Sequence, residues 1–498
     1  MKILITLFIL VQLSFCASLH ISMSANPSRI NPILSTDTVS SEISQYIFNS
    51  LVTYDENASV KLELAKSYRF LDNRTLLFTL RDDVFWSDGE SFNAQDVIFT
   101  YETITSPMVF TPYAESFRHV EKVEAIDNLS IKVTYKYPYF AALETWTIGI
   151  LPYHILKSEN SIMTTSFNQK PVGTGAFTLK EFSTSSNFIL NANKNYFLGS
   201  PKIERIIYHF VPDSATGFLM LKSGELDMGG VTPLQVKRQL DEKFYERFSV
   251  YETMSHSYSY VGFNLDLPKF QDARVREALS LAIDRQELID LLLFGDGVVC
   301  TGPFMPRTKA FNPDVKAPKR DIEMAKELLL QAGYNEKNPL KFELVTNSGQ
   351  RIYIAQILQR QLKDAGVQVS VRVMEWQAFL NTVVQPRRFE AIVMGWQMGL
   401  KSDAYPIWHS ESTKVGGFNF VGYKNQEVDA LIKRAERIVD EEEFNTIYRR
   451  IFKLIKDDNP YLFLYIPKTL TAVKKSISPI RPSIIGIEHN IIEWTKDE

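Results

Sequence analysis

The chain has 498 residues, of which 45% are hydrophobic and 23% are charged, so it can bury large cores and should fold into two or three domains rather than stay disordered. Its 55 Lys and Arg residues nearly balance its 58 Asp and Glu residues, for a formal net charge of -3. The sequence shows no basic stripe that would neutralise a phosphate backbone, so we expect no nucleic-acid partner.

The amino terminus has the pattern of a secretory signal peptide. Lys2 precedes an apolar run from Ile3 to Phe15, which is far shorter than the roughly 20 residues that cross a bilayer. Small residues follow, so we expect cleavage after Cys16 or Ser18 and assign residues 1–18 to the leader. The alternative is a lipoprotein acylated at Cys16, which the bulky Phe15 before it disfavours. The predicted location is the periplasm.

The chain has two cysteines, Cys16 and Cys300. If Cys16 leaves with the signal peptide, Cys300 has no partner and the mature protein has no disulfide. Two cysteines cannot supply a thiolate cluster for zinc or iron–sulfur. No second apolar run is long enough to span a membrane. We therefore expect a soluble mature chain without a resident cofactor.

The first half of the chain is predicted to be rich in strands. The alternating segment Tyr68–Arg81 predicts a strand, and a turn follows at 87–89. Asn93 and Asp96 have the spacing of a helix N-cap and its N3 partner, and Pro107 would end that helix. Further strands are predicted at 131–135 and 175–179.

From Asp272 the apolar residues recur at three-and-four spacing, which predicts amphipathic helices. Three helices and a short fourth alternate with three strands, and we predict the helices from Asp272, from Asp321 to Gly333, across 354–362 and around Trp376, and the strands at 342–346, 367–373 and 391–394. This βαβαβ order predicts a largely parallel sheet. Ligands bind beyond the carboxyl ends of such strands, so the segment just past the last one, Gly395-Trp396-Gln397, is a candidate site.

Signatures of common enzymes are absent from the sequence, including the nucleophile elbow, the phosphate loop, the dinucleotide fingerprint and the zincin helix. Gly173-Thr174-Gly175 is nearest to a phosphate cradle, but it lacks the later glycine and the helix-opening lysine, so we interpret it as a turn. The seven histidines are scattered and include no i, i+4 pair. We therefore predict a protein that is not an enzyme.

Residues 395–423 combine several aromatic side chains with a few charged ones. Apolar walls with charged anchors suit an amphipathic zwitterion. Asp403 would pair with an ammonium group and Arg351 would hold a carboxylate with two parallel hydrogen bonds. Tyr405 and His409 are further candidate contacts. The alternative for all four residues is a structural role in a core, a loop or a helix cap.

Several ordered segments together resemble the extracytoplasmic solute-binding proteins of family 5, which serve ABC importers of peptides, nickel chelates and related solutes. They include Phe85-Trp86-Ser87-Asp88-Gly89 running on to Val97, Val172-Gly173-Thr174-Gly175-Ala176-Phe177, Val261-Gly262-Phe263-Asn264, Asp272-Ala273-Arg274-Val275-Arg276 running on to Arg285, and Ala325-Lys326-Glu327-Leu328-Leu329 running on to Tyr334.

The resemblance implies an α/β fold of the two-lobed periplasmic-binding-protein type (class II, cluster C). Lobe I would comprise residues 19–260, with an extra subdomain at about 47–165. Lobe II would comprise residues 263–472, and residues 473–498 would return to lobe I. The crossings between lobes would lie near 260–264 and 469–473. Most of the matching motifs would then be framework.

The resemblance also implies roles for residues at the cleft. Gly395 and Trp396 match the family's Gly-Trp, and Gln397 would add backbone contacts. Peptide-binding relatives carry an aspartate three residues after this tryptophan for the ligand's α-amine, but this chain has Gly399. Asp403 lies where relatives carry a second acid, so it would substitute, or the amine would be held otherwise. Lys401 would favour an anionic ligand group. Arg351 lies in a local pattern that resembles the carboxylate-binding arginine of dipeptide-binding relatives.

We therefore predict a monomeric periplasmic substrate-binding subunit that captures short peptides between closing lobes and delivers them to the transmembrane subunits of an ABC permease. A nickel-chelate, haem or other small-solute carrier is the first alternative, and in it His409 or arginines would replace the peptide anchors. A secreted hydrolase is the remote alternative. The sequence leaves open the identity and length of the ligand.

Overall fold

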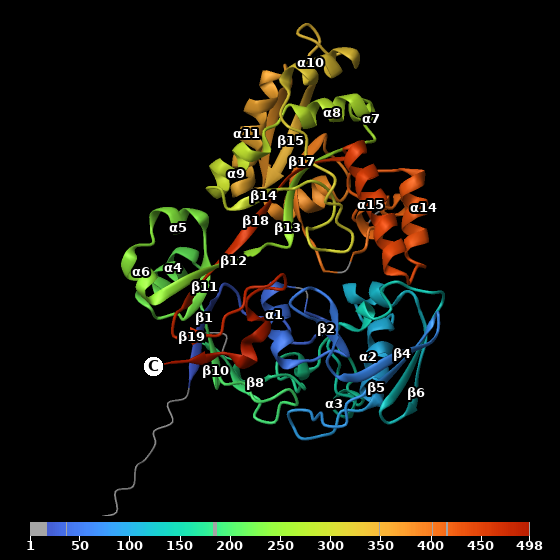
Figure 1. Cartoon of the computed structure of the whole chain (residues 1–498), viewed down its shortest axis with the longest axis vertical. Helices are drawn as coiled ribbons and strands as arrows, with labels where there is room; N and C mark the ends of the chain where they lie inside the picture. The colour runs from blue at the N-terminus through green and yellow to red at the C-terminus, as the bar shows by residue number, and fades with distance from the viewer. Residues whose placement is uncertain are drawn as a thin grey trace, which may run out of the picture.

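The computed structural model describes residues 17–35, 37–182, 187–347, 349–400, 402–414 and 417–497. Nearly all of the predicted signal peptide, residues 1–16, lies outside this part of the chain. Figure 1 shows two lobes connected by strands on one side, with the carboxyl terminus in the lower lobe. Within the described ranges, none of the helices combines the length and the apolar composition that spanning a bilayer requires. The two-lobed α/β architecture confirms the predicted fold class.

The first lobe is built on one half of a large sheet. β1 (Ser18–Met23) is parallel to β10 (Arg205–Phe210) on one side and to β11 (Met228–Val231) on the other. β9 (Asn187–Ala192) and β8 (Phe177–Phe182) extend the sheet in antiparallel pairing. The helices of this lobe are α1 (Thr38–Ile47), α4 (Ser214–Ser223), α5 (Pro233–Arg238) and α6 (Glu242–Arg247).

A second, four-stranded antiparallel sheet lies beside the first, and we call this part the small-sheet subdomain. Its strands, in spatial order, are β4 (Ala65–Asp72), β5 (Thr75–Leu80), β7 (Ser130–Tyr135) and β6 (Val120–Asp127). The elements around it are β2 (Val52–Tyr54), β3 (Val60–Leu62), α2 (Ala94–Thr105), α3 (Tyr153–Leu156) and the 3-10 helices η1 (Pro112–Phe117), η2 (Glu144–Trp146) and η3 (Ser166–Asn168).

The start of α2 confirms the predicted cap, because Asn93 accepts a hydrogen bond from the backbone N–H of Gln95 and Asp96 accepts one from the N–H of Asn93 at 2.9 Å. The segment predicted as one strand, Tyr68–Arg81, is instead a hairpin of β4 and β5. The side chain of Asp72 accepts the N–H of Arg74 at 2.9 Å, which closes a turn that the continuous alternation concealed.

Two antiparallel strands cross between the lobes. β12 (Phe248–Met254) continues into β13 (Ser257–Phe263), and the 14-residue β18 (Tyr461–Lys474) runs beside both. The first part of β18 pairs with β13 and with β14 (Gly297–Val299), and the second part pairs with β12 and β11. The link between β12 and β13 consists of Ser255 and His256.

The second lobe contains a mixed sheet rather than the predicted largely parallel one. β15 (Lys341–Asn347) is parallel to β16 (Gln368–Met374) and to β17 (Ala391–Gln397), whereas β13 is antiparallel to β17 and to β18. The sequence could not show this, because the crossing strands enter the sheet from distant parts of the chain. The helices of the second lobe are α7 (Pro268–Gln271), α8 (Ala273–Leu281), α9 (Arg285–Leu293), α10 (Ile322–Gln331), α11 (Gln350–Asp364), α12 (Trp376–Phe379) with a π-helical extension η4 (Leu380–Val384), α13 (Tyr405–Trp408) with η5 (Ser410–Thr413), α14 (Gln426–Ala435) and α15 (Glu441–Asp458).

The buried apolar clusters follow the lobes. One cluster contains residues from Leu19 to Met228 together with Val473 and Trp494, so both ends of the described chain build the first lobe. The carboxyl-terminal elements are β19 (Ile477–Ser478), η6 (Glu488–Glu493) and β20 (Thr495–Lys496). Two further clusters comprise residues from Tyr258 to Ile466 and form the core of the second lobe. The residue boundaries given above for the lobes stay predictions.

Asp227 fastens the crossing strand to the first lobe. Its side chain is 1% exposed and lies 2.8 Å from Nζ of Lys474 in β18 and 2.7 Å from Nζ of Lys496 in β20. It also accepts the backbone N–H of His20 in β1 at 2.8 Å. Burial would raise the pKa of Asp227, but the hydrogen bonds from Lys474, Lys496 and His20 hold it below its ordinary value.

We expect Asp227→Ala to lower the free energy of unfolding by about 3–5 kcal/mol at neutral pH, because it leaves two lysines without their carboxylate. Urea denaturation measures this. A carboxyl group whose folded pKa is depressed stabilises the protein above its unfolded pKa, near 4, and this contribution disappears as the pH falls through the folded value. The gap between variant and parent should therefore narrow in acid. Glu121→Gln, which breaks an exposed pair with Arg74, is the control and should change stability by less than about 0.5 kcal/mol.

Candidate functional site

Gly395, Trp396 and Gln397 are the last three residues of β17, not a segment beyond it. They are extended because β13 pairs with them, with Ser257 opposite Gln397 and Tyr258 opposite Trp396. The ladder between β17 and β15 extends only over Ala391 and Ile392. The end of β17 is therefore paired on the β13 side, while its β15 side lies beyond that ladder.

The indole ring of Trp396 belongs to a stack of aromatic rings at the edge of the second lobe's core. It is nearly parallel to Phe420, with ring centroids 5.5 Å apart, and to Tyr260 at 6.4 Å. Its Nε1 donates to Oη of Tyr461 at 3.3 Å. The ring of Phe418 approaches at 5.9 Å in an edge-on orientation. Because Trp396 is only partly buried, this stack fixes the orientation of an aromatic surface that is still accessible.

Arg351 lies next to this surface, in the first turn of α11. The helix begins after Gly349, whose φ of 87° favours glycine, and no side chain caps its first N–H groups. Nη1 of Arg351 donates to Oδ1 of Asn347 at 2.9 Å, and the guanidinium lies over the ring of Trp376 at 5.5 Å. Burial lowers the pKa of Arg351, although Tyr260 and Tyr465 oppose this. Among the described residues, no carboxylate forms an ion pair with Arg351.

Gly395 permits the guanidinium to come close to β17. A Cβ atom at this position would lie 3.3 Å from Nη2 of Arg351 and 3.0 Å from the carbonyl oxygen of Tyr258. Both separations are tighter than ordinary contacts, so a larger residue would push the arginine or the strand away. The structure thus brings together three of the predicted site residues, Gly395, Trp396 and Arg351.

A cavity of about 310 Å³ lies where the chain crosses between the lobes. The crossing strands contribute residues 252–256 and 466–468, and the second lobe contributes Val298 and residues 305–307. The first lobe contributes the loop at 482–484. Nε2 of His256 donates a hydrogen bond to the carbonyl oxygen of Ile484. Both lobes therefore form the walls of this cavity.

The strand pairing relates this cavity to Trp396. His256 immediately precedes β13, and Trp396 is directly opposite Tyr258 in that strand. The N–H of Met398 donates to the carbonyl oxygen of His256 at 2.7 Å, which keeps the end of β17 beside the link. Sequence reasoning missed His256 and the two loops at 305–307 and 482–484. The prolines in these loops, Pro306 and Pro482, favour turns, but nothing in the local sequence pattern indicated that the two loops would line one cavity.

The carboxylate of Asp403 already contacts other groups of the protein, so it is not a free anchor for a ligand. Its carboxylate is 3.7 Å from Nη2 of Arg118, which comes from the small-sheet subdomain, and it also accepts the N–H of Tyr405 at 3.0 Å. Arg118 also pairs with Glu436 at 2.9 Å and lies over the ring of Tyr405 at 5.3 Å. Asp403 is thus already paired with a cation of the protein.

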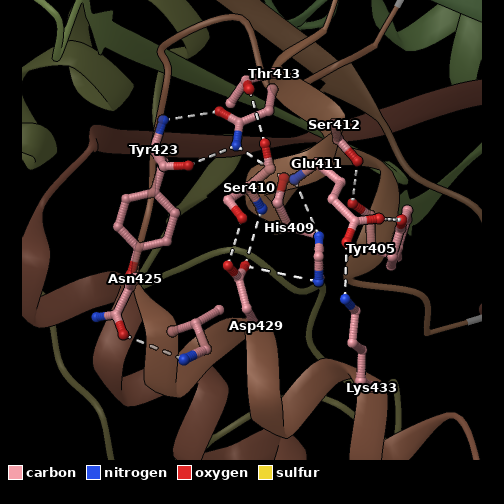
Figure 2. Close-up of polar contacts among 12 residues, drawn as sticks. Tyr405, His409, Ser410, Glu411, Ser412, Thr413, Tyr423, Asn425, Asp429 and Lys433 are labelled. Carbon is pink, nitrogen blue, oxygen red and sulfur yellow. Dashed lines mark hydrogen bonds and ion pairs between the residues drawn. The ribbon is translucent and has the colours of Figure 1, made fainter.

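Tyr405 and His409 form a hydrogen-bonded cluster on the second lobe (Figure 2). The rings stack with centroids 4.4 Å apart. Oη of Tyr405 donates to Glu411 at 2.7 Å, and Lys433 pairs with the same carboxylate at 2.8 Å. The hydrogen bonds from Lys433 and Tyr405 lower the pKa of Glu411 to about 2. The hydroxyl of Tyr405 is therefore engaged within the protein.

The imidazole of His409 is 1% exposed and has a local structural role. Its Nδ1 accepts the N–H of Glu411 at 3.1 Å and so caps η5, while Nε2 lies 3.9 Å from Asp429. Burial lowers the pKa of His409, although Asp429 opposes this. Asp429 also accepts the N–H of Ser410 at 2.9 Å (Figure 2). This environment favours a neutral, buried histidine rather than a ligand contact.

Gln397 and Cys300 are two further residues from the sequence analysis that the structure describes. The side chain of Gln397 is exposed at the end of β17, and Lys401 lies outside the described residues. Cys300 is buried as a free thiol, and burial raises its pKa to about 12. Within the part of the chain that the structure describes, no group of three or more His, Cys, Asp or Glu side chains has an arrangement that would hold a metal ion.

Comparison with known proteins accounts for this architecture. The model of the bacterial extracellular solute-binding proteins, family 5, middle region, matches residues 59–418. The oligopeptide-binding protein AppA of Bacillus subtilis (strain 168) is 31% identical over 491 residues, covering 94% of this chain and 89% of the relative. The structure of Bacillus subtilis AppA in complex with a nonapeptide matches with a TM-score of 0.81 at 30% identity, over 97% of this chain and 99% of that one.

A similar match is found with a protein crystallised with a metal complex. NikZ from Campylobacter jejuni in complex with Ni(L-His) gives a TM-score of 0.82 at 27% identity, over 97% of this chain and all of that one. These matches extend over both lobes. Together with the family model, they establish that this chain belongs to the bacterial extracellular solute-binding proteins of family 5.

Proposed function

We propose that this protein captures short peptides between its two lobes in the periplasm and delivers them to the transmembrane subunits of an ABC importer. The observation that carries the proposal is the partly buried guanidinium of Arg351, which lies beside Gly395 and Trp396 without an acidic partner among the described residues. The likeness to AppA, solved with a nonapeptide, supports it.

The position of Arg351 suits the carboxylate of a peptide. A guanidinium presents two parallel N–H donors that match a carboxylate, and removal from water strengthens that pair. The first N–H groups of α11 lie beside it, and the positive end of this 15-residue helix also favours an anion. An arginine that already had an acidic partner would gain much less from a ligand.

The end of β17 suits the main chain of a peptide. Because the β15 ladder ends at Ile392, the backbone of Gly395–Gln397 can pair with an extended segment on that side. The partly exposed ring of Trp396 supplies apolar contact beside it, and the cavity at the crossing strands adds about 310 Å³ of space between the lobes. Main-chain pairing with an apolar surface accepts peptides of varied sequence.

The site does not favour the form of the nickel-chelate alternative that uses His409. That interpretation assigned the ligand contact to His409 or to arginines, and His409 is 1% exposed and hydrogen-bonded within its own loop. The likeness to NikZ shows that the same architecture also serves nickel complexes, so the identity of the solute depends on the side chains in the cleft.

Native mass spectrometry of protein purified from the periplasm without refolding tests the function directly. We expect additional masses that disappear after mild denaturation and that fragment as short peptides. A single adduct with the isotope pattern of nickel, or an adduct of another small solute, would refute the proposal.

We expect Arg351→Met to weaken binding of peptides with a free carboxyl terminus by about 10- to 100-fold, the value of a hydrogen bond to a charged group. The same peptides with an amidated carboxyl terminus should bind parent and variant similarly. Isothermal titration calorimetry measures both, using peptides that mass spectrometry identifies. Arg360→Met is the matched control, because Arg360 lies on the same helix but is exposed and pairs with Glu287 at 2.7 Å. Equal losses for both kinds of peptide would contradict the assigned role.

We further propose that the signal peptide is cleaved after Cys16 rather than after Ser18. The carbonyl oxygen of Ala17 accepts the N–H of Glu204 at 2.9 Å, and that of Ser18 accepts Nζ of Lys496 at 2.7 Å. Cleavage after Ser18 would remove both contacts from the edge of the first lobe's sheet.

The intact mass of the exported protein should therefore correspond to a chain that begins at Ala17. A mass lower by two residues would indicate cleavage after Ser18. A mass increased by acyl chains would indicate a lipoprotein retained through Cys16.

A further inference from the structure

The two lobes touch at a second place, far from the crossing strands. Figure 1 shows α14 and α15 above the small-sheet subdomain, on the side of the molecule away from β12 and β18. On the lower side, the contact consists of Arg118, which follows η1, and of residues 137–140, which follow β7. On the upper side, it consists of Asp403, Tyr405 and residues at the ends of α14 and α15.

The charged part of this contact is centred on Arg118. Its guanidinium pairs with Glu436 at 2.9 Å and lies 3.7 Å from Asp403, both in the second lobe. The side chains of Arg118, Glu436 and Asp403 are only 21%, 10% and 18% exposed. Burial opposes the positive charge, but Asp403 and the neighbouring acids raise the pKa of Arg118 above its ordinary value. Such shielded charges interact more strongly than an exposed pair.

The apolar part is centred on Phe140. Its ring stacks on Phe444 of α15 with centroids 4.5 Å apart, and it packs against the cores of both lobes. The N–H of Phe140 donates to the carbonyl oxygen of Glu436 at 3.4 Å. The guanidinium of Arg437 lies over the ring of Tyr137 at 5.1 Å. Adjacent residues of the second lobe thus bind adjacent parts of the small-sheet subdomain.

A contact at this place is more sensitive to lobe opening than a contact near the crossing strands. When one lobe rotates about the crossing strands, the parts farthest from those strands move most, so these ion pairs and stacked rings can exist only in the closed conformation. We propose that Arg118, Glu436, Asp403 and Phe140 form a latch that stabilises lobe closure and sets the balance between open and closed protein before any solute is bound.

The latch acts on every solute in the same way, so it does not depend on the peptide proposal. The apparent dissociation constant equals the intrinsic one divided by the closed fraction, and a latch that raises this fraction therefore raises affinity without touching the ligand. It also gives Asp403 a function other than that of a ligand anchor, because its carboxylate joins Glu436, and Glu115 of the small-sheet subdomain, around Arg118 when the lobes meet.

The test measures the distance between the lobes in solute-free protein. Spin labels at Gln95→Cys in α2 and Thr446→Cys in α15 report that distance, because both positions are exposed, whereas the native Cys300 is buried. We expect Arg118→Met to shift the double electron–electron resonance distribution toward longer distances and to lower the ratio of closed to open protein by about 10-fold or more, since it removes hydrogen bonds to charged groups. Arg74→Met, which removes an exposed arginine of the same subdomain, is the matched control and should leave the distribution unchanged.

Glu436→Gln provides an independent variant from the other lobe, which keeps the proposal testable if Arg118→Met folds poorly. It should also open the protein, and the double variant should open it little further than either single one, because both substitutions break the same interaction. Distance distributions identical to the parent's in both single variants would overturn the latch. Fully additive shifts in the double variant would also overturn it.

Discussion

The two-lobed molecule depends on the antiparallel pairing of β18 with the continuous segment that forms β12 and β13. One strand of 14 residues takes part in the sheets of both lobes, so the lobes share a backbone ladder that can twist but not slide. Asp227 fixes the lower end of β18 to the first lobe through Lys474. Any relative motion of the lobes must therefore occur about this ribbon, which defines where a cleft can open.

The site follows from the position of that ribbon. β13 draws the end of β17 beside the link at His256, which places Trp396 near the crossing, and the first turn of α11 adds Arg351 from the other side of β17. Gly395 is small enough for the guanidinium to approach the strand. Among the described residues, an arginine without an acidic ion-pair partner, an aromatic surface and a strand end thereby adjoin within one lobe.

Closure of the lobes depends on charged contacts that lie far from the crossing strands. Asp403 and Glu436 of the second lobe contact Arg118 of the small-sheet subdomain. Beside them, Phe140 stacks on Phe444. The crossing strands and the latch lie at opposite ends of the cleft. The latch already favours the closed conformation in the absence of solute, and a bound solute favours it further. The latch thus acts on the affinity for every solute, whereas Arg351 acts on the affinity for particular solutes.

The sequence alone determined the elements with strong local signals: the capped helix at Asn93, the helices that begin at Asp272 and Asp321, and the motifs that identify the family. It also pointed to Trp396 and Arg351. Only the tertiary structure decided that β13 extends β17 through Gln397, that His409 is buried and that Asp403 pairs with Arg118. Those outcomes depend on contacts between residues far apart in the chain, here 285 positions for Asp403 and Arg118 (403 − 118), and local periodicity carries no information about such contacts.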